Sequence, residues 1–222
     1  LKEIHEQPRA LRQAISGRID ELDTGVELEL SLPETYLQSL EEIQIVACGT
    51  SYHAGLYAAE LLETYADVVV SVHIASEYDF DGGRDPLETL VVAITQSGET
   101  ADTLSALRVA NKAGAKTLAL TNTLGSTVTR DADDAIFIRA GPEIGVAATK
   151  TFVSQVATAT LLTIHLGHAR GSLSIAGTET LLDALRTLPG SVQQVLDQNP
   201  QIKQAAHTYA DSDAFFYIGR RT

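Results

Sequence analysis

Two short turns rich in hydroxyl side chains are the segments of this chain best suited to hold an anion. The first reads Cys-Gly-Thr-Ser at 48–51, and the second reads Thr-Gln-Ser-Gly-Glu-Thr at 95–100. Each follows a short apolar run and precedes apolar residues at helical spacing, so each is expected to open a helix. Helix N-termini offer free N–H donors and a partial positive charge, and hydroxyls add further donors. The two turns therefore predict a phosphate-binding cradle that needs neither lysine nor arginine.

The same residue types also have a purely structural use. Serine and threonine cap the N-termini of many helices, and the first turn on its own fits that use better. The segment 95–100 carries three hydroxyls and one amide, which is more than one helix cap needs. Two such turns at one place would favour the cradle over capping.

A third segment suggests that the backbone approaches a ligand closely. Residues 141–150 read Gly-Pro-Glu-Ile-Gly-Val-Ala-Ala-Thr-Lys, with two glycines and two alanines ahead of a long apolar stretch. Thr149 is expected to cap the helix that follows. Lys150 is expected to be solvated, with contact to a phosphate as the less favoured interpretation.

An alternation of strands and helices must position these turns. Short apolar runs predict strands at 43–48, 68–75, 90–95, 117–121 and 135–138. Apolar residues at helical spacing predict helices at 4–18, 51–65, 101–113, 126–130, 149–166, 174–188 and 190–210. This order predicts a three-layer α/β/α sandwich with a five-stranded parallel sheet in flavodoxin-like order. Ligands bind outside the carboxyl ends of such strands, where the turns after the first and third strands would meet.

The chain is expected to divide into three parts. Residues 1–33 would form an N-terminal helix and an acidic loop, 34–190 the α/β domain, and 191–222 a linker helix with the start of a truncated second lobe. The apolar run 214–219 carries that last expectation, and a sixth edge strand is the alternative. The helix at 149–166 is apolar nearly all round and should be buried. With the second lobe missing, it would also leave apolar surface uncovered, which predicts a homodimer.

Composition argues against several classes of function. The net charge of −13 disfavours nucleic-acid binding and leaves any phosphate site dependent on local donors. Cys48 is the sole cysteine, so neither an internal disulfide nor a cysteine-based metal site is expected. His165 and His168 share a helix face without a third ligand, so no metal is expected. No apolar run reaches about 20 residues and the N-terminus does not read as a signal peptide, so we expect a cytoplasmic protein without a membrane span.

Several stretches, in matching order, resemble the SIS, or sugar isomerase, family. They read Ala-Cys-Gly-Thr-Ser at 47–51, Gln-Ser-Gly-Glu-Thr-Ala-Asp-Thr at 96–103 and Glu-Ile-Gly-Val-Ala at 143–147. Lys-Glu-Ile-His-Glu-Gln-Pro at 2–8 and Ser-Glu at 76–77 narrow the resemblance to the first SIS lobe in the isomerase half of glucosamine-6-phosphate synthases. The resemblance spans essentially the whole chain.

The resemblance implies roles for the residues of all three segments. It assigns the phosphate to Ser51, Thr95, Gln96, Ser97 and Thr100, with Gly49 and Gly98 shaping the turns, Cys48 and Thr50 near the reactive end of the sugar, and Val146 and Ala148 along it. The family usually has serine at the positions of Thr95 and Ala148. Thr95 keeps the hydroxyl, whereas Ala148 lacks the one that would contact the sugar.

The resemblance also implies the reaction of a longer enzyme. That enzyme would transfer glutamine-derived ammonia to fructose 6-phosphate and isomerise the product to glucosamine 6-phosphate, without a cofactor. Its glutaminase domain, its second SIS lobe and its C-terminal tail would carry the catalytic groups, so this chain alone would hold none and would be inactive. The expected ligands are fructose 6-phosphate, glucose 6-phosphate and glucosamine 6-phosphate, and the expected assembly is a homodimer.

Three other interpretations stay open. Another SIS protein, such as a sugar-phosphate isomerase, a deglycase or the sensor domain of a regulator, would share the cradle. A dinucleotide-binding domain would need Gly-x-Gly-x-x-Gly after the first strand, whereas the first turn holds only Gly49. A dimerisation lobe that no longer binds sugar would keep the fold without the ligand.

The charge predicts that salt stabilises this chain. It has 5 lysines and 11 arginines against 29 acidic residues, a composition suited to a halophilic source. Molar KCl screens the mutual repulsion of the acidic groups, so the melting temperature should rise from dilute buffer to molar salt. Thermal melts across a KCl series measure this, and a melting temperature that falls steadily with KCl would contradict the halophilic origin.

Overall fold

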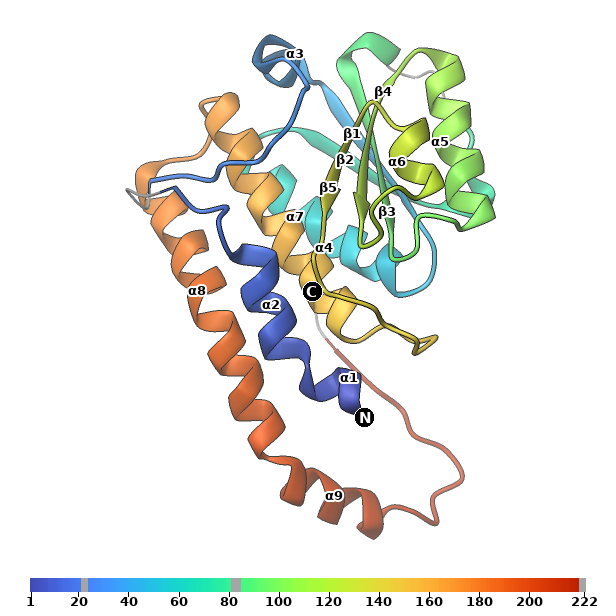
Figure 1. Ribbon diagram of the computed structural model, residues 1–222, viewed down its shortest axis with the longest axis vertical. Coiled ribbons are helices and arrows are strands. Elements are labelled where there is room, and N and C mark those ends of the chain that lie inside the picture. Colours follow the sequence, from blue (N-terminus) through green and yellow to red (C-terminus); the bar gives the residue numbers. More distant parts are fainter. Residues whose placement is uncertain (21–23, 81–84, 220–222) are drawn as a thin grey trace.

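The computed structural model describes residues 1–20, 24–80 and 85–219, and a parallel sheet lies at its centre (Figure 1). The strands are β1 (Glu42–Ala47), β2 (Val69–Ile74), β3 (Thr89–Thr95), β4 (Lys116–Thr121) and β5 (Asp134–Phe137). They pair in the order β2-β1-β3-β4-β5, and every pair is parallel. The predicted five-stranded sheet and its flavodoxin-like order are confirmed. Its inner strands consist mostly of apolar residues because helices bury them on both faces.

Helices cover both faces of this sheet. α4 (Thr50–Tyr65) and α7 (Lys150–Ala169) pack on one face, whereas α5 (Ala101–Ala113) and α6 (Thr127–Asp131) pack on the other (Figure 1). The remaining short elements are α1 (Lys2–His5), α3 (Glu34–Ser39) and the 3₁₀ turns η1 (Ala75–Glu77) and η2 (Pro86–Glu88). The three-layer sandwich is therefore present as predicted.

Two further helices form an outer layer on α7. α2 (Gln7–Ile15) and α8 (Ile175–Asp197) pack against it and against each other, with Leu11, Leu161 and Leu182 fully buried between them. Fourteen of the 20 residues of α7 are buried, so its predicted burial is confirmed. The expectation that this helix leaves apolar surface uncovered is wrong, because α2 and α8 cover it. Neither α7 nor any other helix in the described part of the chain has the length and apolar character of a membrane span.

Helix boundaries differ from the prediction in three places. The helix expected at 4–18 is two helices, because the chain changes direction at Glu6 before α2, with Pro8 in its first turn. α3 lies in a stretch for which no element was predicted. The break expected near Pro189 is absent, since α8 continues through that buried proline, and the chain breaks at Gln198 before α9 (Asn199–Thr208). Burial of apolar side chains along α8 offsets the roughly 3 kcal/mol that an interior proline costs a helix.

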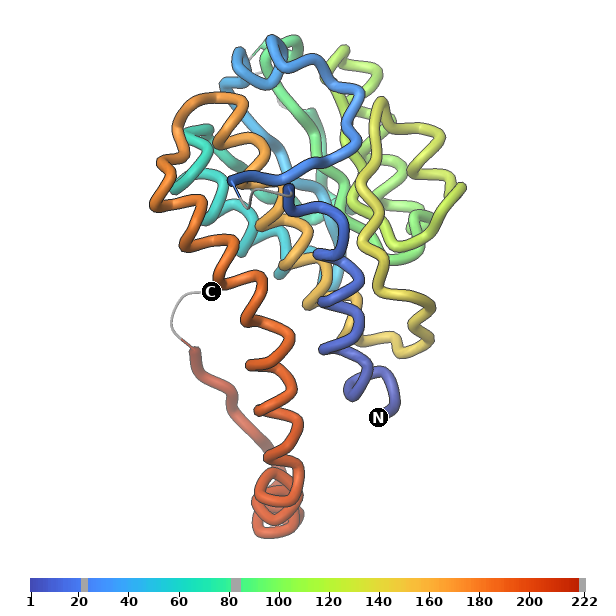
Figure 2. The backbone as a smooth tube through the Cα atoms, turned by 60° about the vertical axis from the view of Figure 1, so that its left-hand side comes forward, coloured from blue at the N-terminus to red at the C-terminus, as the bar shows by residue number. Residues whose placement is uncertain are grey.

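The last described residues turn back along the molecule. α9 lies beyond the lower end of α8, and the chain after it runs back up toward the middle of the molecule (Figure 2). Residues 214–219 form neither helix nor strand, and Phe216, Tyr217 and Ile218 are more than nine-tenths exposed. The alternative of a sixth edge strand is therefore not realised among these residues, and 220–222 lie outside the described part. The division at 33 and 190 and the start of a second lobe stay predictions.

Arg170 fastens the end of α7 to the end of α3 and to the loop between α4 and β2. Its guanidinium donates to five backbone carbonyl oxygens, those of Leu37, Gln38, Leu40, Ala66 and Asp67, at 2.7 to 3.3 Å. Leu37 and Gln38 lie in α3 and Leu40 directly after it, whereas Ala66 and Asp67 connect α4 to β2. One side chain thus holds three elements at the edge opposite the hydroxyl-rich turns.

Loss of this guanidinium should destabilise the fold strongly. Arg170→Met leaves several carbonyls without a donor, so the free energy of unfolding should fall by about 2–4 kcal/mol. Arg108→Met is the matched control, because the Arg108 guanidinium forms only an exposed ion pair with Asp131 at 2.8 Å and should cost about 1 kcal/mol or less. Urea unfolding measures both variants, and equal losses would contradict the fastening role.

Candidate functional site

The adjacency of β1 and β3 brings the two hydroxyl-rich turns to one edge of the sheet. β1 ends at Ala47, which pairs with Ile94, and β3 ends one residue later, at Thr95. The two strands therefore end side by side. α4 begins at Thr50 and α5 at Ala101, and both start at this carboxyl edge. The predicted meeting of the two turns at the reversal of strand order is therefore present in the fold.

The first turn places one hydroxyl inside the fold. Gly49 precedes α4 with φ of +58°, a value that glycine adopts without strain. Ser51, in the first turn of α4, is buried, and its Oγ accepts a hydrogen bond of 2.8 Å from Nε2 of Gln155 on α7. Cys48 and Thr50 are half-buried, and Cys48 packs on the α5 side of the sheet.

The second turn folds around two of its own hydroxyls. The backbone N–H of Gly98 donates to Thr95 Oγ1, and that of Glu99 donates to Ser97 Oγ, each at 3.2 Å. Each hydroxyl accepts in the turn, so its own hydrogen is left to donate elsewhere. The N–H groups of Gly98 and Glu99 thus both donate within the turn.

Gly98 is required by a close approach within this turn. Its φ is +70°, and a Cβ built on it would lie 2.2 Å from Ser126 Oγ and 2.6 Å from Ser126 Cβ. The N–H of Val128 donates to the Gly98 carbonyl at 3.0 Å, so the turn is held against the start of α6. The position therefore leaves no room for a side chain.

Helix capping does not account for the hydroxyls. The residue that caps α4 is Gly49, and the one that caps α5 is Thr100, whose side chain makes no capping hydrogen bond. Ser97 Oγ bonds the amide two residues later, ahead of α5, and Ser51 Oγ bonds another helix. The capping interpretation of these residues is therefore not realised.

Amide side chains join the third segment to the second turn and to the loop after β4. Gln96 Nε2 donates to the Glu143 carbonyl at 3.2 Å, and Asn122 Nδ2 donates to the Gly141 carbonyl at 2.7 Å. Residues 141–149 therefore lie beside the second turn at the carboxyl edge. Ala148 is half-buried, whereas the Val146 side chain is fully exposed and stands away from the packed part of the site.

Glu143 caps α7 in place of the residue that was predicted to do so. Its carboxylate accepts the N–H groups of Thr149, Lys150 and Thr151 at 2.8 to 3.2 Å, together with the Thr149 hydroxyl at 2.9 Å. Thr149 makes no capping bond of its own. Burial alone would raise the pKa of Glu143, but these hydrogen bonds outweigh it and hold that pKa below the ordinary value. Glu143 lies six residues before Thr149, so no local sequence pattern predicted that it caps α7.

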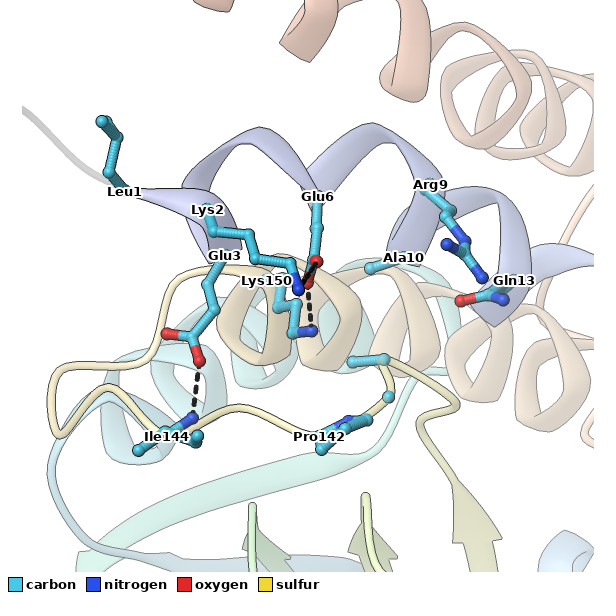
Figure 3. Close-up of a pocket in the computed structure, with 12 residues that line it drawn as sticks. Leu1, Lys2, Glu3, Glu6, Arg9, Ala10, Gln13, Pro142, Ile144 and Lys150 are labelled. Carbon is cyan, nitrogen blue, oxygen red and sulfur yellow. Dashed lines mark hydrogen bonds and ion pairs between the residues drawn. The ribbon is translucent and has the colours of Figure 1, made fainter.

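Lys150 is buried, and the expectation that it is solvated is wrong. Its side chain is 5% exposed, and Nζ lies 2.6 Å from Glu6 Oε2 (Figure 3). The hydrogen bond from Lys150 lowers the pKa of Glu6. Glu3 adds a second link, because its carboxylate accepts the N–H groups of Ile144 at 2.7 Å and Gly145 at 3.2 Å.

The N-terminal helices and the third segment enclose a cavity of about 440 Å³ (Figure 3). Charged side chains of both signs line it, namely those of Lys2, Glu3, Glu6, Arg9 and Lys150. No residue of the two hydroxyl-rich turns reaches it. Among the residues that the structure describes, no group of three or more histidine, cysteine or carboxylate side chains is placed to hold a metal ion.

Comparisons with known proteins agree on one family. A model of the SIS domain matches residues 36–165. The chain is 72% identical, over its whole length, to a glutamine–fructose-6-phosphate aminotransferase (isomerizing) of Halobacterium salinarum, and it covers 37% of that protein. It is 45% identical to the protein of the same name from Methanosarcina acetivorans, over 99% of this chain and 36% of that one. The chain thus spans a little over a third of these relatives.

A solved structure extends the likeness to three dimensions. The C-terminal domain of a glucosamine-fructose-6-phosphate aminotransferase from Francisella tularensis matches with a TM-score of 0.87 and 35% identity. The match covers 95% of this chain and 58% of the other. The helices outside 36–165 therefore belong to the shared architecture as well.

The second turn should not tolerate a side chain at Gly98. Gly98→Ala combines the left-handed backbone with a clash against Ser126, so the free energy of unfolding should fall by about 2–5 kcal/mol. Gly114→Ala is the matched control, because its φ is +94° and no atom lies within 4 Å of the added Cβ. That variant should lose about 1–2 kcal/mol from the backbone alone. Equal losses in urea unfolding would argue against the close approach.

Proposed function

We propose, because this chain belongs to the SIS domain family, that it binds sugar phosphates at the carboxyl edge of its sheet as one lobe of an isomerising glutamine–fructose-6-phosphate aminotransferase. The 72% identity to the Halobacterium salinarum relative and the likeness to the Francisella tularensis domain support this assignment. Glucose 6-phosphate, fructose 6-phosphate and glucosamine 6-phosphate are the proposed ligands.

The observation that carries the proposal is the hydrogen bonding of the hydroxyls. Ser51, Thr95 and Ser97 each accept a hydrogen bond from the protein through Oγ or Oγ1. A hydroxyl has one hydrogen and two lone pairs, so each can still donate. A phosphate only accepts, and three donors without counter-charge suit it in a protein of net charge −13.

Binding rather than chemistry is the proposed task of these turns. Glu99 is their one carboxylate, and it accepts the N–H and the hydroxyl of Thr127 at 2.8 and 2.7 Å. These hydrogen bonds lower the pKa of Glu99, which disfavours a proton-donating role near neutral pH. In the proposed whole enzyme, ammonia from glutamine reaches fructose 6-phosphate, and acid–base groups outside this chain isomerise the product to glucosamine 6-phosphate.

The proposed setting is a longer cytoplasmic protein. A glutaminase domain and a second SIS lobe would accompany this lobe, and two copies would form a homodimer. The acidic composition and the Halobacterium salinarum relative support a halophilic source. Thr95 retains the hydroxyl that the family's serine would supply, whereas Ala148 removes a hydroxyl from the sugar side of the site.

Removal of the Ser97 hydroxyl tests the phosphate role. A hydrogen bond to a charged group contributes roughly 1.5–3 kcal/mol, so Ser97→Ala should weaken glucose 6-phosphate binding by about 10- to 150-fold. Thr100→Val should weaken binding in the same direction, because the Thr100 hydroxyl makes no capping bond. Ser105→Ala is the matched control, since Ser105 is an exposed serine within α5.

Calorimetric titration gives the affinities, and thermal melts give the stabilities. Unchanged affinity with a lower melting temperature in Ser97→Ala would refute the phosphate role. A wild-type chain that binds none of the three sugar phosphates would refute the proposed function itself.

A further inference from the structure

We propose that Gln155 is a positioning residue, whose amide fixes the direction in which the Ser51 hydroxyl donates its hydrogen to the sugar phosphate. This inference rests on the proposed function, because it assigns the ligand of Ser51 to that site. Gln155 itself lies on α7 behind the first turn, and its role is to act through Ser51.

The contact joins two helices at the cradle. Ser51 is 7% exposed and lies in the first turn of α4, and Gln155 is 1% exposed and lies in the second turn of α7. Gln155 Nε2 donates to Ser51 Oγ at 2.8 Å, and 104 residues separate the two in sequence. That bond occupies one lone pair of the hydroxyl, so the Ser51 hydrogen must point away from Gln155. A hydroxyl held in this way meets an anion already oriented as a donor.

Gln155 differs from two other buried polar residues of α7. Thr158 and Thr163 are also buried, but their hydroxyls donate to carbonyls one turn earlier in the same helix, at 2.8 and 3.0 Å. Both hydroxyls therefore have their hydrogen-bond partners within α7. The amide of Gln155 instead reaches across to α4, and its only hydrogen bond in the described part of the chain ends on a cradle hydroxyl.

The other end of the same amide indicates that stability does not explain this residue. Gln155 Oε1 is buried and has no hydrogen-bond partner among the described residues. A buried acceptor without a donor destabilises a fold, and an apolar side chain of similar length would fill the space without that penalty. The amide is thus unfavourable for packing, and its benefit lies in the bond to Ser51.

The test is a double-mutant cycle read by affinity and by stability. Gln155→Met should weaken glucose 6-phosphate binding about three- to tenfold, because Ser51 loses its fixed orientation. The melting temperature should stay the same or rise, because the unpaired acceptor is removed. In the Ser51→Ala background, Gln155→Met should leave the affinity unchanged, since the two residues act through one hydroxyl.

Further variants keep the cycle decisive. Gln155→Asn retains the amide but is one methylene too short to reach Ser51, so it should lose affinity as Gln155→Met does. Thr158→Val is the matched control on the same helix and should leave the affinity unchanged.

Several results would overturn the inference. A fall in melting temperature at constant affinity would make Gln155 a structural link between α4 and α7. A rise in affinity would mean that Ser51 donates to Gln155 in the unliganded protein. An affinity loss of equal size in the Ser51→Ala background would show that Gln155 acts by another route.

The proposed function and the inference about Gln155 can be refuted by different results. A wild-type chain without affinity for sugar phosphates removes both proposals. A wild-type chain that binds, with a Ser51→Ala variant that binds weakly and a Gln155→Met variant that binds normally, removes only this one.

Discussion

The burial of α7 on all sides is the constraint on which the rest of the structure depends. The helix lies between the sheet with α4 on one side and α2 with α8 on the other. The first N–H groups of the helix and the Lys150 ammonium are shielded from water, so they need partners from the protein. Glu143 satisfies the first N–H groups, and Glu6 neutralises Lys150. The third segment and the N-terminal helices are held in place by these same bonds.

The acidic composition of the protein is a second constraint, and it bears on the proposed anion site. The net charge of −13 repels a phosphate at long range, and the charged side chains near the third segment pair with one another. The proposed cradle would instead use hydroxyls whose oxygens already accept hydrogen bonds from the protein. Attraction of this kind acts only at contact distance, so the proposed site would discriminate by shape and hydrogen-bond geometry rather than by long-range charge.

The fold could be predicted from the sequence because each strand and each turn is marked by residues that are adjacent in the chain. Apolar runs marked all five strands, and the glycine and hydroxyl content of 48–51 and 95–100 marked the turns that meet at the sheet edge. What could not be predicted depends on residues far apart in the chain. Capping by Glu143 needs the loop to fold back, burial of Lys150 needs α2 above it, and the continuity of α8 through Pro189 needs the surface beneath it. Gln155 offered one usable signal, since it is a lone amide in an otherwise apolar or hydroxyl-bearing stretch.

The outer layer of α2 and α8 also completes the apolar core around α7. The family segment 36–165 contains the sheet and the two turns, but it omits the helices that shield α7 from water. A chain trimmed to that segment would expose Leu161 and Ile164, which are fully buried here, and would leave Lys150 without Glu6. The packed core around α7 therefore extends beyond the segment that the family model matches. Residues that a family alignment would count as flanking sequence are part of its core.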